Sequence, residues 1–116
     1  ERLTCVRCAG PWELLRALEE LQEALTGQAL GDVSLLAVDS VSAAISPVLG
    51  GGQAVGHELM QAAAAHLLFA ALERGVCVLA VNHTVSGGRG AGEPKPALGV
   101  SWADVPHYRV QLRRPG

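Results

Sequence analysis

The stretch of sequence that decides the fold is Val33-Ser34-Leu35-Leu36-Ala37-Val38-Asp39-Ser40. A second stretch of the same form comes later in the chain and reads Val76-Cys77-Val78-Leu79-Ala80-Val81-Asn82-His83. Each is an apolar run without regular alternation, and each ends on polar residues. Such runs are typical of strands that are covered on both faces, as in a parallel sheet. The two stretches therefore predict an α/β fold with neighbouring parallel strands at 33–39 and 76–81.

Helical patterns accompany these two strands. Leucines recur at helical spacing over 11–25, where Pro11 suits a first helical position and Gly27 follows the end. An Ala- and Leu-rich segment over about 53–74 predicts a second helix. The strand–helix–strand order over 33–81 predicts a right-handed crossover, so the two strands should run parallel.

Three further segments carry their own predictions. Residues 3–7 predict a short strand, and residues 107–113 predict a last strand because apolar and polar side chains alternate there. The segment 86–99 holds five glycines and two prolines, and it predicts a long mobile loop.

Composition limits the class of protein. A chain of 116 residues forms one domain at most. Residues 1–82 carry nine Asp or Glu against four Arg, whereas residues 83–116 carry five Lys or Arg against two acidic residues. The basic end indicates either an anionic partner or a solvated basic face. Cys5 and Cys8 make half of a zinc pattern without a second pair, and no apolar run could span a bilayer, so neither metal binding there nor a membrane partner is expected.

Polar residues follow both strands, and they are Asp39, Ser40, Asn82 and His83. In an open parallel sheet, ligands bind beyond the carboxyl ends of the strands. An Asp after four apolar strand residues has the form of a Walker B segment, whose carboxylate orients Mg²⁺ or its water shell beside a nucleotide phosphate. Asn82 and His83 suit a sensor of that nucleotide. The alternatives are that Asp39 caps a helix, and that Asn82 caps a strand end before a surface histidine.

Two other kinds of chemistry bear on these residues and on the loop that follows them. A Ser-His-Asp hydrolase is not expected, because the chain has no Gly-x-Ser-x-Gly elbow and the adjacent side chains of Asp39 and Ser40 should diverge. Arg89 and Lys95 place two cations on the glycine-rich loop, and such loops order on nucleic-acid backbones through phosphate contacts. The chain contains no Gly-Lys-Ser/Thr phosphate loop.

Three stretches carry a resemblance to a known family. They are Val38-Asp39-Ser40-Val41-Ser42-Ala43-Ala44-Ile45-Ser46-Pro47, Asn82-His83-Thr84 and Lys95-Pro96-Ala97-Leu98-Gly99-Val100-Ser101-Trp102. Together they resemble the ATPase core of RecA-type recombinases, and within it the eukaryotic paralogues of the Rad strand-exchange recombinase. The resemblance extends over about residues 3–114, and Lys-Pro-Ala-Leu-Gly-x-Ser-Trp is among its more selective motifs.

The resemblance implies a partial RecA-like ATPase core with a mostly parallel sheet flanked by helices, of which residues 1–116 are the carboxyl-terminal portion. By this resemblance Asp39 is the Walker B acid, which holds Mg²⁺ through water, and Ser40 is its neighbour at the nucleotide. The segments 48–56 and 84–99 correspond to the first and second DNA-facing loops of the family.

Asn82 and His83 fall where recombinases place an Asn-Gln pair that links the state of ATP to the second loop, with His in place of Gln. The family implies homologous recombination in the nucleus, with ATP and Mg²⁺ as cofactors, single-stranded or branched DNA as ligand, and other recombinase paralogues as partners. Its phosphate loop, catalytic glutamate and amino-terminal domain lie upstream of these residues. Residues 1–116 alone are therefore expected not to hydrolyse ATP and to expose a sheet edge. The alternative is an ATP-incompetent scaffold for other paralogues.

Overall fold

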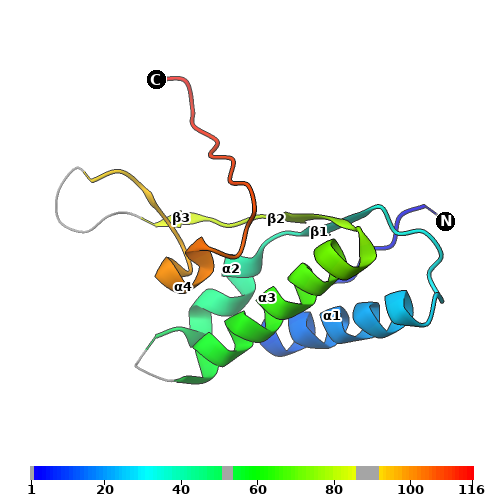
Figure 1. Cartoon of the computed structure of the whole chain (residues 1–116). Helices are drawn as coiled ribbons and strands as arrows, with labels where there is room; N and C mark the ends of the chain where they lie inside the picture. The colour runs from blue at the N-terminus through cyan, green and yellow to red at the C-terminus, as the bar shows by residue number, and fades with distance from the viewer. Residues whose placement is uncertain (1, 51–53, 86–91) are drawn as a thin grey trace.

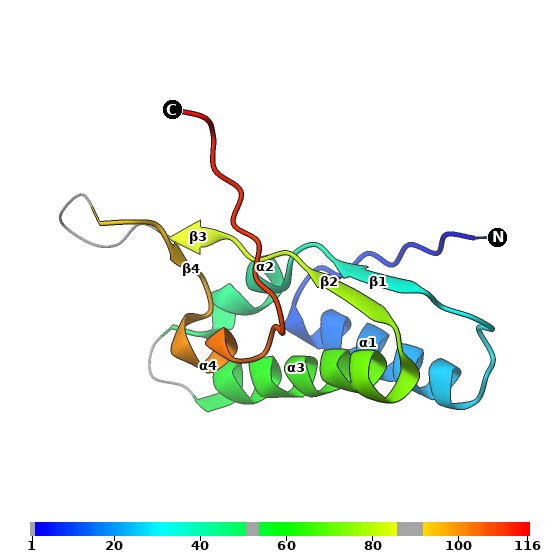
Figure 2. The same ribbon diagram turned by 45° about the horizontal axis from the view of Figure 1, so that its top comes forward.

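The computed structural model describes residues 2–50, 54–85 and 92–116. Two long helices, α1 (Pro11–Thr26) and α3 (Ala54–Arg74), pack side by side beneath a parallel pair of strands, β1 (Leu35–Val38) and β2 (Cys77–Ala80) (Figure 1). Both helices lie on the same face of that pair, as a second view confirms (Figure 2). The prediction of an α/β fold with parallel strands joined through a helix is confirmed.

Local chemistry explains where the long helices begin and end. Pro11 is the first residue of α1, and the backbone N–H of Ala9 donates to the carboxylate of Glu13 at 2.6 Å, which anchors the first turn. Leu14 and Leu18 are the buried residues of α1, and they face α3 in the core. Gly75 follows α3 with a φ of +64°, a left-handed conformation that glycine adopts without a steric cost.

Short elements complete the chain beyond the strand ends. Helix α2 (Val41–Ile45) and the 3-10 turn η1 (Ser46–Val48) follow β1, while β3 (Thr84–Val85) and β4 (Lys95–Pro96) form a small antiparallel hairpin after β2. Helix α4 (Gly99–Ala103) then returns to the core (Figure 2). The predicted long loop 86–99 is thus partly regular, because its end lies in β4 and α4, and residues 86–91 are outside the described residues.

The core is made of aliphatic side chains from every layer, with one tryptophan from α4. Its most buried members include Val41, Ile45, Met60, Ala63 and Trp102. Small alanines on the buried side of α3 bring that helix close to its neighbours.

One prediction about the strands is wrong. The sequence favoured strands covered on both faces, but exposure alternates along β1 and β2, and Leu35 and Leu79 are 58% and 56% exposed. Alternation arises because α1 and α3 cover one face of the pair and no described element covers the other. The main sheet has two strands among the described residues, so each keeps one unpaired edge, as the resemblance implied.

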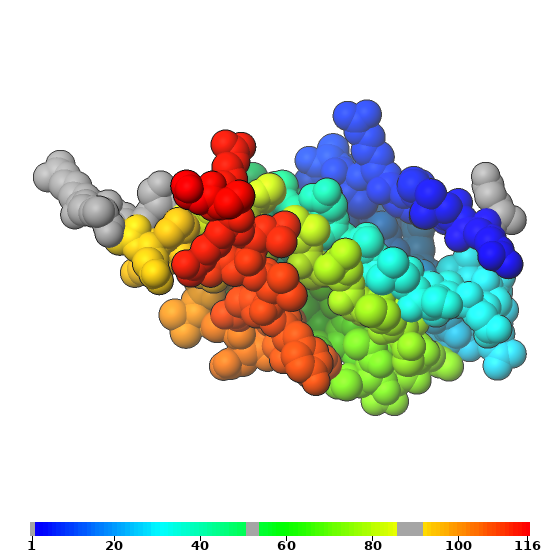
Figure 3. Space-filling model, turned by 90° about the horizontal axis from the view of Figure 1, so that it is seen from above, coloured from blue at the N-terminus to red at the C-terminus, as the bar shows by residue number. Residues whose placement is uncertain are grey.

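Two predicted strands are also absent from the described chain. Residues 3–7 and 107–113 have no regular structure, and both segments are largely exposed. The alternation in 107–113 is present, with Tyr108, Val110 and Leu112 all more than 80% exposed, but no described strand lies beside it to accept its hydrogen bonds. The tail extends away from the body of the molecule after α4 (Figure 1), so it overlies the hairpin and α4 when the molecule is seen from above (Figure 3). Residues 111–114 of the tail share a groove with the hairpin. In the part of the chain that the structure describes, no helix is both long and apolar enough to cross a membrane.

Candidate functional site at the strand ends

The polar ends of the two parallel strands meet at one edge of the sheet. The backbone N–H of Val81 donates to the carbonyl of Val38 at 2.9 Å, and the N–H of Val41 donates back to the carbonyl of Val81 at 3.1 Å. Asp39 and Ser40 lie between these two bonds on one strand end, and Asn82 follows directly on the other. The predicted convergence of these polar residues is what the parallel register produces.

Ser40 joins the strand end of β1 to the strand end of β2. It is the N-cap of α2, where its hydroxyl accepts from the N–H of Ala43 at 3.1 Å, and the same Oγ lies 2.9 Å from Nε2 of His83. The alternative interpretation was that Asp39 caps a helix, but the residue that caps α2 is Ser40. Although Ser40 and His83 are hydrogen-bonded like a nucleophile and its base, Ser40 is 92% shielded and already caps a helix. This geometry supports a structural contact rather than acyl transfer.

Ser42 is a site residue that the sequence analysis did not single out. It is 2% exposed, and its Oγ accepts from the backbone N–H of His83 at 3.0 Å. A small polar residue one turn after a strand end is the only sequence signal that could have indicated it. Ser40 and Ser42 together attach α2 to both the side chain and the main chain of His83.

The second strand end is tied to the hairpin. Nδ2 of Asn82 donates to the carbonyl of Ala97 at 2.9 Å, and the N–H of Ala97 donates to the carbonyl of His83 at 2.8 Å. Oδ1 of Asn82 is buried and has no hydrogen-bond partner among the described residues. A buried acceptor without a partner is costly, so this oxygen is a place where a donor from a ligand or another segment would be stabilising.

Asp39 stands apart from this network. Its side chain is exposed, and the peptide bond that joins it to Ser40 is cis. No group of three or more His, Cys, Asp or Glu side chains among the described residues could enclose a metal ion. A single exposed carboxylate at a strand end suits Mg²⁺ that keeps most of its waters and is completed by phosphate oxygens. The sequence has such a carboxylate but no Gly-Lys-Ser/Thr phosphate loop.

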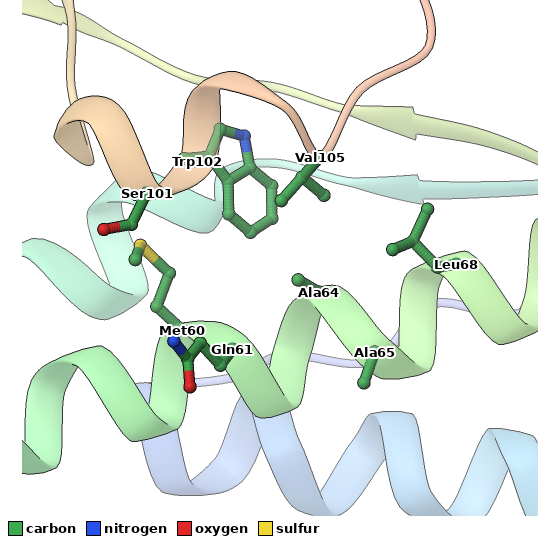
Figure 4. A pocket seen from close by; sticks show the side chains of 8 residues that line it. All are labelled: Met60, Gln61, Ala64, Ala65, Leu68, Ser101, Trp102 and Val105. Atoms are coloured by element: carbon green, nitrogen blue, oxygen red, sulfur yellow. The ribbon is translucent and has the colours of Figure 1, made fainter.

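One described pocket lies away from these strand ends. An apolar pocket of about 200 Å³ opens between α3 and α4, with Trp102 and Met60 in its wall (Figure 4). None of the four predicted site residues lines it. Its lining is mostly apolar, with Gln61 and Ser101 as the polar side chains, and we do not assign it a function.

A second groove lies between the hairpin and the tail. It has a volume of about 310 Å³ and is lined by Thr84, Glu93 and Pro94 on one side and by residues 111–114 on the other. Arg113 and Arg114 therefore lie beside the hairpin that carries the exposed Lys95. The other predicted DNA contact, Arg89, is outside the described residues.

The cysteines form no disulfide among themselves: Cys5 and Cys77 are exposed, and Cys8 is half-buried. Burial, and secondarily the negative charge of Glu13, raise the pKa of the Cys8 thiol. This thiol is therefore protonated at neutral pH.

The chain was compared with known proteins. No protein-family model matches it. The bovine (Bos taurus) protein named DNA repair protein RAD51 homolog 4 is 37% identical over 115 residues, which is 97% of this chain and 35% of that protein. The mouse (Mus musculus) protein of the same name is 36% identical over 115 residues, again 97% of this chain and 35% of the relative. A probable DNA repair protein RAD51 homolog 4 of Dictyostelium discoideum is 28% identical over 80 residues, or 69% of this chain and 22% of that protein.

The chain thus spans about a third of the length of the curated relatives that it matches first. The alignment covers nearly all of the chain, including both strand ends and the hairpin. Since the α/β fold with its parallel strand pair is compatible with part of a RecA-like core, the chain belongs to the RecA-type recombinase family, among the RAD51 paralogues.

Proposed function

We propose that this chain acts in DNA repair by homologous recombination, as the part of a recombinase paralogue that relates a bound nucleotide to a DNA-contacting hairpin. The relatives at 36–37% identity carry DNA repair in their names. The single observation that carries the proposal is the hydrogen-bonded path from the end of β1 to the hairpin. That path runs from Ser40 and Ser42 to His83, and from His83 to Ala97.

At the nucleotide end, Asp39 is the proposed Walker B carboxylate. Its exposed side chain at the carboxyl end of β1 would hold one face of a hydrated Mg²⁺, with Ser40 beside it. Mg²⁺ bound with ATP would neutralise charge on the phosphates during hydrolysis. The phosphate loop would come from another part of a longer polypeptide, so residues 1–116 alone are proposed not to turn over ATP. Asn82 and His83 would respond to the nucleotide through the network behind Asp39.

At the DNA end, cations surround the hairpin. Lys95 is exposed on β4, and Arg113 and Arg114 line the groove beside it. Arg89 belongs to the same segment by sequence. Cations at such a groove, which Glu93 also lines, suit the backbone of single-stranded or branched DNA, whose phosphates release counterions on binding. A nuclear location follows from this role.

The nucleotide role is tested with the full-length natural polypeptide that contains this chain. Asp39→Asn should reduce ATP turnover in the presence of oligo(dT) by at least about 100-fold, a loss typical of removing one preorganised electrostatic group. Asp32→Asn, an exposed carboxylate just before β1, is the matched control and should leave turnover unchanged. Unchanged turnover in Asp39→Asn would exclude the Walker B assignment.

The DNA role has its own test. Lys95→Ala combined with Arg89→Ala should weaken oligo(dT) binding. The slope of log affinity against log salt concentration should become less steep by the amount that corresponds to about two phosphate contacts. Adding Arg113→Ala and Arg114→Ala should flatten it further, because these residues line the same groove. A slope that none of these changes alters would exclude the hairpin as the contact.

A second candidate function is a scaffold for other recombinase paralogues that does not depend on ATP. The uncovered face of the sheet supports it, since Leu35, Leu79 and the exposed Cys77 present apolar surface there. Retention of partner paralogues by the full-length Asp39→Asn protein, with and without nucleotide, would support the scaffold. Loss of retention on removing nucleotide would contradict it.

A further inference from the structure

Ser42 lies in the first turn of α2, but its hydroxyl does not cap that helix. The cap of α2 is Ser40, so the hydroxyl of Ser42 is not needed to satisfy the N-terminus of its own helix. Instead, the buried Oγ accepts from the main-chain N–H of His83, 41 residues away in the sequence. A side chain that is almost fully buried and bonded to a distant backbone amide fixes the position of that backbone.

The backbone that Ser42 holds leads directly into the hairpin. β3 begins at Thr84, the residue after His83, and the carbonyl of His83 accepts from the N–H of Ala97 just after β4. Nδ2 of Asn82 adds a second bond to the carbonyl of the same Ala97. Both strands of the hairpin are therefore fastened at the level of residues 82–83, close to the end of β2 (Figure 2).

The other end of the link lies at the predicted nucleotide side. α2 starts at Val41, so Ser42 is three residues from Asp39, with the cap residue between them. A displacement of Asp39 and Ser40 would carry the first turn of α2 with it, and the bond from Ser42 would pass that displacement to the main chain of His83. The contact between Ser40 and the His83 ring runs in parallel, but it ends on a rotatable, exposed side chain.

We propose that Ser42 is a positioning residue that couples the nucleotide state at Asp39 to the affinity of the β3–β4 hairpin for DNA. The proposal rests on the proposed function, because it presupposes that both ends of the link bind their ligands. Coupling between two sites is a free energy that acts equally in both directions, so nucleotide should strengthen DNA binding by the same factor as DNA strengthens nucleotide binding. Ser42 contributes to that factor without touching either ligand.

The experiment measures that factor in the full-length natural polypeptide. The Kd for fluorescein-labelled oligo(dT) is measured with and without a slowly hydrolysed ATP analogue and Mg²⁺, and the ratio of the two values is the coupling. Ser42→Ala removes the acceptor and should lower this ratio by about three- to tenfold. Ser101→Ala is the matched control: Ser101 is an exposed serine of α4 that makes no side-chain hydrogen bond within the described chain, so the ratio should stay at the wild-type value.

A merely structural role would lower the melting temperature of Ser42→Ala and leave the ratio unchanged, and that result would overturn the inference. Amide hydrogen exchange gives a second readout, because His83 should lose protection in Ser42→Ala while α1 keeps its protection. If Ser42→Ala shows no cooperative melting, Ser42→Cys replaces it, since sulfur fills the site but accepts hydrogen bonds weakly, and the same ratio decides. A wild-type ratio of one would contradict the proposed function itself, whereas a wild-type ratio that Ser42 variants preserve contradicts only the coupling role of Ser42.

Discussion

Gly56 offers the sharpest test of how α3 packs against the segment that follows α2. It is buried in the first turn of α3, where the helix passes the backbone of η1. A Cβ added at this position would lie 2.2 Å from the carbonyl oxygen of Val48, 2.8 Å from its carbonyl carbon and 3.1 Å from Cα of Leu49. All three are backbone atoms, so no side chain can rotate away to make room.

Two opposing effects decide the sign of Gly56→Ala. Alanine is favoured over glycine inside a helix by at most about 1 kcal/mol, and less in a first turn. Against this, the new methyl group must open the contact with Val48 by about 1 Å to reach an ordinary carbon–oxygen distance, and overpacking of this kind costs roughly 1–3 kcal/mol. The steric cost exceeds the gain in helix propensity. We therefore expect the free energy of unfolding to fall by about 1–2 kcal/mol.

Urea unfolding followed by circular dichroism measures this change for wild type, Gly56→Ala and a matched control. Gly50→Ala serves as the control, because a Cβ there meets nothing within 4 Å and its backbone is not left-handed. The control should be neutral or more stable by up to about 1 kcal/mol, since alanine reduces the entropy of the unfolded chain. A Gly56→Ala protein as stable as the wild type would refute the close approach of α3 to Val48.

Three further predictions concern the site, the thiol and the open sheet face. Ser40→Ala should lower the free energy of unfolding by about 1–2 kcal/mol, because it removes the cap of α2; an unchanged thermal midpoint would contradict the capping role. The rate of iodoacetamide labelling at Cys8 should rise with pH, with a midpoint above 9.0, the ordinary pKa of a thiol. Glu13→Gln should lower that midpoint only in part, because burial is the larger cause of the raised pKa. The folded chain holds the proton of the Cys8 thiol more tightly than the unfolded chain does, so the free energy of unfolding should decline as the pH rises above 9.0. A free energy of unfolding that rises over that range would contradict this prediction. Leu79→Thr should change the free energy of unfolding by less than about 0.5 kcal/mol, because this side chain is exposed on the uncovered sheet face; a large loss of stability would show that the face is covered.

Elements that depend on local chemistry were predictable from the sequence. The helix expected over 11–25 is α1, and its start follows from Pro11 and Glu13. The helix expected over about 53–74 is α3, which ends before a left-handed glycine. Apolar runs likewise located β1 and β2, and the intervening helix implied their parallel direction.

Elements that depend on a distant neighbour were not predictable from the same patterns. Residues 107–113 have the alternation of a strand, but a strand exists only where another backbone accepts its hydrogen bonds, and no described strand lies beside this tail. Leu35 and Leu79 look like core residues in sequence because the apolar run does not state how many faces of the sheet are covered. Hydrophobicity predicts that a segment is able to be buried, and the surrounding elements decide whether it is.

The site shows the same division. Two parallel strands place Asp39 and Asn82 at the same edge of the sheet, so their proximity could be predicted from the sequence. The connections between them could not be reached, because the bond from Ser42 to His83 depends on the direction in which α2 leaves β1. The fit of each predicted residue to nucleotide or DNA stays a prediction.

The network also divides the predicted sensor pair into two different kinds of contact. Asn82 is bonded to the hairpin through its side chain, whereas His83 is bonded to Ser42 and Ala97 through its main chain, and only its contact with Ser40 uses the imidazole. A main-chain bond survives replacement of the side chain, so the link to the hairpin does not depend on the chemical identity of residue 83. This explains physically how a histidine is accommodated at a position where the resemblance implied a glutamine. The side-chain groups that the link requires are therefore the amide of Asn82 and the hydroxyl of Ser42.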